Sequence, residues 1–499
     1  MKAFAKIAGA AVLAAMLASC ATKNFTQNGE NEYLDYFVKL VEDAEGGDAE
    51  AQYDLGLSYE VGDDIEQDFA EAAKWFRMAA EQGYSAAQYM LGACYTTGDG
   101  VPKDYSEAVK WFHMAAEQGD SAAQYMLGVY YAKGDGVAQN DAEAVKWFRM
   151  SAEQGNAWAQ NSLGLLHMSG EGVPEDYSEA VKWFRMAAEQ DLAEAQSNIG
   201  RCYVNGDGIA KNEAEGVIWL LKAAEGGCVE AQYSIGWRCK MGDGVPKNDV
   251  EAMKWYRMAA EQGNAMAQCN LGACYAEGEG VAKDSAEALR LYRKSAEQGN
   301  AVAQYNVGMR YEIGEVVDQD FAEAAKWFRM AAEQGFAAAQ GMLGVYYSVG
   351  DGVAQDFAEA VKWHRKAAEQ DFAMAQYNLG MCYKRGEGVA KNETEAAKWY
   401  RKAAEQGHEG AQKALRELEN QKERFENHRE EAEQDDDEAL FAAAQDALIG
   451  AGKNAFRQSG GSLQLPQRAA GEKLAALLGK PLSIAEILSQ GELQAPPTI

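Results

Sequence analysis

The residue types that could carry out catalysis are few in this chain of 499 residues, and they are not grouped. The sequence contains no P-loop, no H-E-x-x-H, no G-x-S-x-G and no dinucleotide fingerprint. The histidines are scattered without metal-ligand spacing at His113, His167, His364, His408 and His428. The repeated G-D-G-V loops lack the alternating oxygen ligands of a calcium site, so they are better interpreted as turns. We therefore predict no catalytic residue, no metal site and no cofactor.

One cysteine has a context that predicts covalent modification. Residues 1–19 have the features of a secretory signal peptide, with two lysines before an apolar stretch too short to span a bilayer. The segment ends in L-A-S-C, which resembles a bacterial lipobox, so we expect cleavage before Cys20 and lipid attachment to its sulfur. An ordinary secretory signal that happens to contain a cysteine is the alternative. Because Ala21 rather than Asp follows, we expect an outer-membrane lipoprotein facing the periplasm, with residues 20–30 as a lipid-anchored tether.

A six-residue motif that returns every 36 residues sets the organisation of the chain. It starts as A-Q-Y-D-L-G at Ala51 and recurs without insertion in ten full copies and a half copy at Ala411. A fixed period in this range predicts stacked helix pairs in which each unit contacts its neighbours. The first helix of a unit places Ala51, Leu55 and Tyr59 on one face, which predicts its buried side. The sequence thus predicts an all-α fold, an α-solenoid of helix-turn-helix repeats over residues 47–416.

Glycines and capping residues predict the helix boundaries within each unit. Gly56 would let a neighbouring helix approach closely, and Gly62 would stop the first helix. The second helix is expected to begin with a capping box, in which Asp68 accepts from a free backbone N–H and Glu71 reaches back three residues. Gly83 is expected to end that helix in the left-handed conformation.

Tryptophan recurs at one position of the second helix. It occupies this position in nine units, at Trp75, Trp111, Trp147, Trp183, Trp219, Trp255, Trp327, Trp363 and Trp399. The single exception is Leu291. Ligand stacking could explain such a series, but its helical spacing with Ala72, Phe76 and Ala79 favours a structural core between repeats.

The pattern A-x-A-Q-Y-x-L-G-x-x-Y-x-x-G-x-G-V-x-x-D-x-x-E-A-x-K-W-F-x-x-A-A-E-Q-G is similar to the Sel-one-like repeat, a relative of the tetratricopeptide repeat. The resemblance covers residues 47–416. It implies a right-handed α-superhelix with the first helices on the concave side, and adaptor roles such as assembling envelope complexes or binding envelope or host proteins. Some cysteine-rich members of the family are described as β-lactamase-like, but S-x-x-K, S-D-N and K-T-G are absent here. A β-lactamase-like hydrolase is therefore a distant alternative.

Seven cysteines remain after Cys20. Four of them share one repeat position, two or three units apart, and are too distant to bridge one another: Cys94, Cys202, Cys274 and Cys382. One bridge could form among the residues that crowd the middle units, Cys202, Cys228, Cys239, Cys269 and Cys274. Buried free thiols are the favoured state, although an oxidising compartment would act against it.

The segments that flank the repeats have other compositions. Residues 31–46 align with a second helix that lacks its tryptophan, which predicts an N-terminal capping helix. Residues 417–438 are charged and predict a solvated helix or linker, and the order of the tail at 439–499 is left open. The net charge of −30 argues against nucleic acid as a partner, because phosphate binding needs clustered lysine and arginine.

The side of the first helix opposite its predicted core varies from unit to unit. This stripe carries Trp158 and Trp237, the only tryptophans outside the second-helix position. It also carries tyrosine, methionine and arginine, the residue types of protein-binding hot spots. From it we select as candidate partner-binding residues Trp158, Trp237, Tyr125, Tyr233, Arg201, Met126, Met266 and Tyr305. The alternative is that these residues pack on neighbouring first helices, and the tyrosines are the weakest members of the set.

Two classes of function remain after these exclusions. The first is an envelope-anchored scaffold, without enzymatic activity, that binds partner proteins along the concave face. The second is binding of peptidoglycan or polysaccharide, with exposed tryptophan and tyrosine rings as stacking platforms. Sugar stacking needs flat, separate, exposed rings, whereas protein binding needs a contiguous apolar patch. The partner and the oligomeric state are not encoded in any motif of the sequence.

Overall fold

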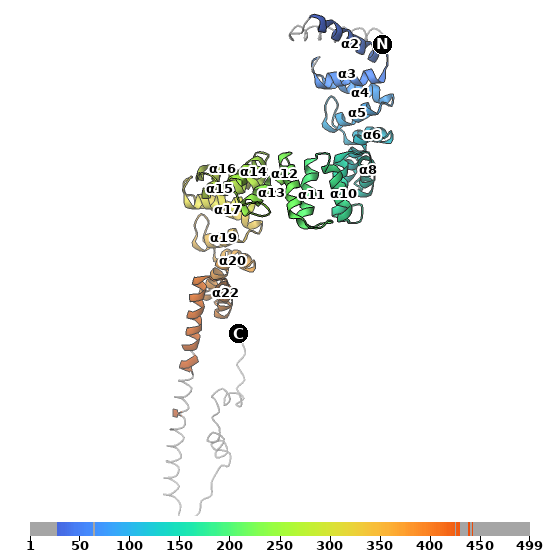
Figure 1. Cartoon of the computed structure of the whole chain (residues 1–499). Helices are drawn as coiled ribbons and strands as arrows, with labels where there is room; N and C mark the ends of the chain where they lie inside the picture. The colour runs from blue at the N-terminus through green and yellow to red at the C-terminus, as the bar shows by residue number, and fades with distance from the viewer. Residues whose placement is uncertain (1–26, 63–64, 425, 430–437, 440–441, 443–499) are drawn as a thin grey trace, which may run out of the picture. The chain divides into compact units, whose positions relative to one another are not determined.

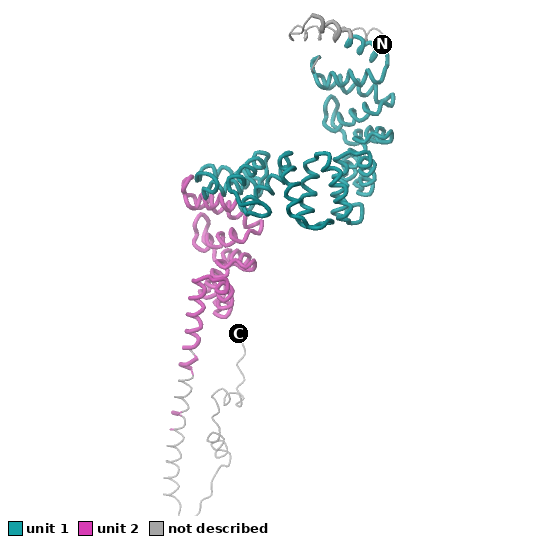
Figure 2. The backbone as a smooth tube through the Cα atoms, viewed as in Figure 1, with its two compact units in different colours: residues 1–303 teal, residues 304–499 magenta. Residues whose placement is uncertain are grey.

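The structure, a computed structural model, is helical throughout the part of the chain that it describes, apart from the connecting turns (Figure 1). The described residues are 27–62, 65–424, 426–429, 438–439 and 442. The predicted signal peptide, Cys20 and nearly all of the predicted C-terminal tail lie outside them. The helices form two compact units, residues 1–303 and 304–499, each described here by itself (Figure 2).

Helix pairs follow the predicted 36-residue period, which confirms the α-solenoid of helix-turn-helix repeats. The first helices are α3 (Ala49–Val61), α5 (Ser85–Thr97), α7 (Ser121–Lys133), α9 (Ala157–Ser169), α11 (Ala193–Asn205), α13 (Val229–Met241), α15 (Ala265–Glu277), α17 (Ala301–Ile313), α19 (Ala337–Val349) and α21 (Ala373–Arg385). The second helices are α4 (Phe69–Glu81), α6 (Tyr105–Glu117), α8 (Asp141–Glu153), α10 (Tyr177–Ala188), α12 (Glu213–Glu225), α14 (Asp249–Glu261), α16 (Ser285–Glu297), α18 (Phe321–Glu333), α20 (Phe357–Glu369) and α22 (Glu393–Glu405).

The helix boundaries lie where glycine and capping residues predict them, with one difference in the capping box. Gly62 ends α3 with a φ of 74°, and Asp68 accepts from the backbone N–H of Glu71 at 3.0 Å. The Glu71 carboxylate, however, pairs with Lys74 at 2.5 Å instead of reaching back to Asp68. The reciprocal half of the predicted capping box is not formed because the Asp68 N–H already donates to the Tyr59 carbonyl at 3.0 Å.

The two helices of a unit approach closely at a glycine. A Cβ atom on Gly56 would lie 2.6 Å from Cε1 of Phe76, which leaves no room for any side chain there. The Phe76 ring fills this space and is completely buried, as are Phe112, Phe184 and Phe328 at the equivalent position. The glycine of the repeated motif is therefore a packing requirement between the first and second helices of the same unit.

A series of buried glutamines, which we call the glutamine ladder, joins successive repeats by hydrogen bonds. The Gln124 side chain donates to the carbonyl of Ala116 in the preceding unit at 3.1 Å, and it accepts from Gln154 at 2.7 Å. The same pair of bonds is made by Gln52, Gln88, Gln160, Gln232, Gln268, Gln340 and Gln376. A buried amide that satisfies a helix carbonyl fixes the register of two units, because an unmade hydrogen bond there would be costly.

The tryptophans of the second helices lie between successive units, as their spacing predicts. Trp147 is buried against Phe112, Ala116 and Leu127 of neighbouring helices. Trp399 is also buried, and the remaining members of the series are half-buried. Five of these pack on the same kind of cluster: Trp75, Trp111, Trp183, Trp219 and Trp255. The Trp series therefore covers the edge of the core, and the adjacent Phe76 series forms its centre.

Additional helices lie beside the first and last repeats. Helix α2 (Gln27–Glu45) begins four residues before the start expected for the capping helix and buries Phe37, Leu40 and Ala44 on the first repeat. After the last full repeat, residues 409–424 are helical, and Ala411 and Leu418 are buried against Tyr400 of α22.

Candidate functional site

The exposed side of the first helices is the candidate site. We define the first-helix surface as the side chains at the positions of Glu50, Tyr53, Asp54 and Leu57 in each repeat. These positions face away from Ala51, Leu55 and Gln52, which are buried. Large apolar side chains are exposed on this surface at Trp158, Leu165, Trp237, Met266, Val302 and Met374.

Trp158 and Trp237 are the largest of these exposed side chains. Trp158, on α9, is 49% exposed, and Trp237, on α13, is 39% exposed. The other repeats carry residues such as alanine, valine or glutamate at the same positions. Burial is therefore not the reason for tryptophan at these two places.

The structure separates the eight candidate residues into two groups. Trp158, Trp237, Met266 and Arg201 are exposed, and Met266 reaches 49%. The other four, Met126 and three tyrosines, are half-buried: Met126, Tyr125, Tyr233 and Tyr305. The tyrosine series turns its rings toward the second helix of the same unit, so it belongs partly to the core.

Ring contacts explain why the tyrosines are half-buried. Tyr125 and Phe148 have ring centroids 5.7 Å apart at an interplanar angle of 48°, and Tyr305 lies 5.6 Å from Phe328. Tyr233 makes the equivalent contact with Tyr256 at 6.1 Å. Burial raises the pKa of Tyr125 and of Tyr305 above the ordinary tyrosine value. These rings are tilted against the core and do not lie flat and free.

Polar contacts join the first helices of adjacent repeats along this surface. The Ser162 side chain of α9 lies beside the Tyr125 hydroxyl of α7 and acts to lower its pKa, against the larger effect of burial. Asn198 of α11 donates to Asn161 of α9 at 2.9 Å. The first-helix surface is therefore continuous over α7, α9 and α11, and Trp158 lies in the middle of this stretch.

The histidines have separate structural roles where the structure describes them. His113 pairs with Glu117 at 3.2 Å, and the backbone N–H of Ala411 donates to His408 at 3.1 Å. His364 is buried in the position that phenylalanine holds in other repeats, and burial lowers its pKa to about 4. Within the described ranges, no group of three or more histidine, cysteine, aspartate or glutamate side chains could hold a metal ion.

The seven cysteines that follow the predicted lipid-attachment site are all buried. Their burial agrees with the favoured prediction of buried thiols, and the redox state of the cysteines in the middle units stays a prediction. Burial raises the pKa of Cys94 to about 12 and that of Cys202 to about 11. Thiols with such pKa values are poor nucleophiles at neutral pH, which agrees with a packing role.

Two further features of the structure have a signal in the sequence. One is the glutamine ladder, whose members recur every 36 residues in both A-Q and E-Q-G. The other is a row of methionines on the second helices, each about 40% exposed: Met78, Met114, Met150, Met186, Met258 and Met330. Their spacing was visible, but periodicity alone does not show which side of a helix faces the solvent.

No helix in the described part of the chain has both the length and the apolar character needed to cross a membrane.

These features define a class of protein. The chain is a helical-repeat scaffold of α-solenoid type, and such scaffolds typically mediate protein–protein interaction through an extended surface. It belongs to the Sel1 repeat family. The family model matches ten consecutive segments, residues 49–84, 85–120, 121–156, 159–192, 193–228, 229–264, 265–300, 301–336, 337–372 and 373–408.

Solved structures of other proteins resemble this chain. The crystal structure of c5321, a protective antigen present in uropathogenic Escherichia coli strains and displaying an SLR fold, is 42% identical. That match covers 76% of this chain and 81% of c5321, with a TM-score of 0.66. A Sel1 repeat protein from Oxalobacter formigenes is 34% identical over 62% of this chain and 89% of its own length, with a TM-score of 0.47. No curated protein matches the chain.

Proposed function

We propose that this protein is an envelope-anchored scaffold that binds partner proteins along the first-helix surface. The observation that carries the proposal is the exposure of Trp158 and Trp237 at positions where other repeats accept small side chains. Exposed tryptophans at places where the fold does not need them match the composition of protein-binding hot spots. We propose no enzymatic activity and no nucleic-acid partner.

The charge of the same surface indicates which kind of partner surface would be complementary to it. Glu194 and Glu230 occupy the position of Trp158 in the next two repeats, and both are exposed. The chain as a whole carries a net charge of −30. A partner surface that places basic side chains around an apolar patch would be complementary, and it would be steered toward the scaffold at low ionic strength.

Carbohydrate stacking receives less support from the geometry. Tyr125, Tyr233 and Tyr305 lie tilted against core aromatic rings, so they do not offer the flat, open faces that sugar rings need. Trp158 and Trp237 remain, and they lie two repeats apart at different helix positions. This spacing suits two contact points of a protein surface better than one sugar-binding platform.

The experiment compares partner capture by three forms of the full chain. The double replacement Trp158→Ala with Trp237→Ala should leave helix content and unfolding nearly unchanged and weaken partner binding by about 2 kcal/mol or more, as for hot-spot residues. The matched control replaces two exposed side chains of the second helices, Met150→Ala with Met186→Ala, and should retain binding. Proteins that co-purify with the wild type from detergent-solubilised envelope should be lost in the first variant alone. Normal binding by a stable tryptophan double variant would refute the proposal.

Membrane attachment is tested separately. We propose that lipid on Cys20 holds the protein in the outer membrane, facing the periplasm. The replacement Cys20→Ser should shift the protein from the membrane fraction to a soluble or unprocessed pool. A Cys20→Ser variant that stays with the membranes without another anchor would contradict the lipoprotein assignment.

A further inference from the structure

The seventh repeat lacks a side chain that nine other repeats supply. Trp111 packs on a cluster that includes Ala80 of the preceding repeat and Leu91 of its own repeat. Leu291 holds the same position in α16 and packs on the equivalent residues, Ala260 and Leu271. Leucine is shorter than tryptophan and has no second ring, so it covers less of the apolar floor that these residues form.

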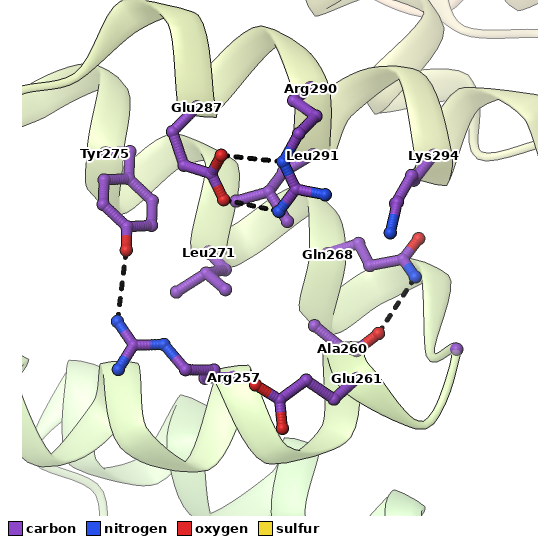
Figure 3. Close-up of a pocket in the computed structure, with 11 residues that line it drawn as sticks. Arg257, Ala260, Glu261, Gln268, Leu271, Tyr275, Glu287, Arg290, Leu291 and Lys294 are labelled. Atoms are coloured by element: carbon purple, nitrogen blue, oxygen red, sulfur yellow. Dashed lines mark hydrogen bonds and ion pairs between the residues drawn. The ribbon is translucent and has the colours of Figure 1, made fainter.

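A pocket of about 450 Å³ lies at this place (Figure 3). Figure 3 shows Leu271 in the middle of the lining residues, and α14, α15 and α16 supply the walls. Charged and polar side chains surround the opening: Arg257, Glu261, Tyr275, Glu287, Arg290 and Lys294. The pocket therefore has a rim that carries three cations and two carboxylates, around a small apolar base whose residues Ala260, Leu271 and Leu291 are each at least nine-tenths buried.

Hydrogen bonds hold most of this rim in place. Arg290 makes a two-point contact with Glu287, at 2.7 and 2.5 Å, and Arg257 donates to the Tyr275 hydroxyl at 3.1 Å. These bonds fix the side chains around the opening, as the dashed lines in Figure 3 show. Lys294 makes no ion pair with any residue that the structure describes. A preorganised rim lowers the entropic cost of binding, because few side chains must be ordered when a ligand enters.

The position of Lys294 indicates what the pocket accepts. In three other repeats a lysine at this position lies over the ring of the series tryptophan. The distances from Nζ to the ring centroid are 4.5 Å for Lys222 over Trp219, 4.2 Å for Lys366 over Trp363 and 4.9 Å for Lys402 over Trp399. Lys294 is the equivalent cation, but its own repeat provides no ring. An ammonium group over an aromatic face is attracted by the ring quadrupole.

We propose that this pocket binds an aromatic side chain of a partner, with the indole of a tryptophan as the occupant that fits best. The occupant would lie on Ala260 and Leu271, at the place of the indole in other repeats, and Lys294 would cover its face. Identifying the occupant as part of a protein rests on the proposed scaffold function. The pocket's preference for an aromatic ring rests only on its geometry.

A small probe tests the pocket without knowledge of the partner. N-acetyl-L-tryptophanamide should bind the full wild-type chain saturably, with millimolar affinity, in saturation-transfer-difference NMR. The variant Leu291→Trp restores the residue of the other repeats, so it should fold with unchanged or higher thermal stability. It should no longer bind the probe. No probe binding to the wild type, or equal binding to Leu291→Trp, would overturn the proposal.

Two further variants test the role of the cation and of the missing ring. Lys294→Met introduces the residue that six other repeats carry at this position. It should weaken binding of the probe about 2- to 5-fold, as expected for loss of a cation–π contact. Trp363→Leu should open an equivalent pocket beside Lys366 and add a second probe-binding site. Unchanged affinity in Lys294→Met, or a folded Trp363→Leu protein with still only one site, would contradict the assignment.

Partner capture distinguishes this pocket from the proposed function. If the pocket receives a partner side chain, Leu291→Trp should weaken capture at least 5-fold while Trp158 and Trp237 remain intact. Normal capture by Leu291→Trp, together with loss of capture by the tryptophan double variant, would overturn the partner assignment of the pocket and leave the scaffold function standing.

Discussion

Two groups of tryptophans can be compared within this one chain. The nine on the second helices pack between repeats, and Trp147 and Trp399 are buried there. The two on the first-helix surface, Trp158 and Trp237, keep 49% and 39% of their surface exposed. The same residue type thus contributes to the fold in one position and remains available to a partner in the other. Which role it has depends on the helix face and not on its hydrophobicity.

Leu291 occupies the second-helix position at which nine other repeats carry tryptophan. The repeat still folds, because α16 keeps its bounds and Leu291 is 4% exposed. The space that the indole would fill becomes part of a pocket instead. A structural position can therefore become a binding position by loss of one ring.

The largest effect should follow from removing a buried member of the second-helix series. Trp147→Ala should destabilise its region by about 3–5 kcal/mol, the range for truncating a large aromatic residue in a core. Because repeat stability is a sum over units and their interfaces, calorimetry should show a split or broadened transition. Trp147→Leu is the matched control and should cost less, since Leu291 is accepted at this position. Identical unfolding of wild type and Trp147→Ala would contradict a structural role.

His364 offers a pH-dependent test of the same core. Its imidazole is buried in the phenylalanine position, and burial lowers its pKa from 6.5 to about 4. The unfolded chain binds this proton more readily between pH 6.5 and 4, so the folded state loses stability as the pH falls through that window. The loss attributable to this group should reach about 3 kcal/mol near pH 4.

The control for this titration is His364→Phe, which places the residue of five other repeats in the site. Carboxylates also titrate in this range, so the quantity to measure is the difference in unfolding free energy between wild type and variant at each pH. That difference should grow as the pH falls. A constant difference from pH 7.5 to pH 4 would show that His364 does not titrate in this way.

A smaller effect is expected for the glutamine ladder. Gln124→Ala removes two hydrogen bonds of a buried amide, one to the Ala116 carbonyl and one from Gln154, which should cost about 1–3 kcal/mol. Gln196→Ala is the comparison, because Gly226 stands where the ladder partner of Gln196 would be and only a long bond to Asp191, at 3.4 Å, takes its place. Denaturant unfolding should therefore show a smaller loss for Gln196→Ala. An equal loss in both variants would show that the Gln–Gln bond contributes nothing.

The smallest effect on stability is expected on the first-helix surface. Trp158→Ala should change the free energy of unfolding by less than about 0.5 kcal/mol, as for most surface substitutions. Thermal unfolding measured beside Trp147→Ala would show the contrast between the two groups directly. Marked destabilisation by Trp158→Ala would place this residue in the core and remove it from the candidate site.

The sequence determined the repeat period, the helix boundaries and the core position of the tryptophan series. These features depend on local rules that recur in every unit: a glycine beside Phe76, a capping residue at Asp68, and apolar spacing along each helix. The same periodicity identified Trp158 and Trp237 as departures from the pattern. Because the chain contains ten repeats, positions that stay the same can be distinguished from positions that vary within this one sequence.

Only the tertiary structure decided how side chains of different helices share the remaining space. In the packed structure the Tyr125 ring contacts Phe148, and the Glu71 carboxylate pairs with Lys74. Gln124 donates to the Ala116 carbonyl of the preceding repeat, and a pocket lies beside Leu291. Each of these outcomes depends on distances between elements that are separate in sequence. Local propensity and spacing specify which helix face a residue occupies, but competition for hydrogen bonds and volume is resolved only when the helices pack.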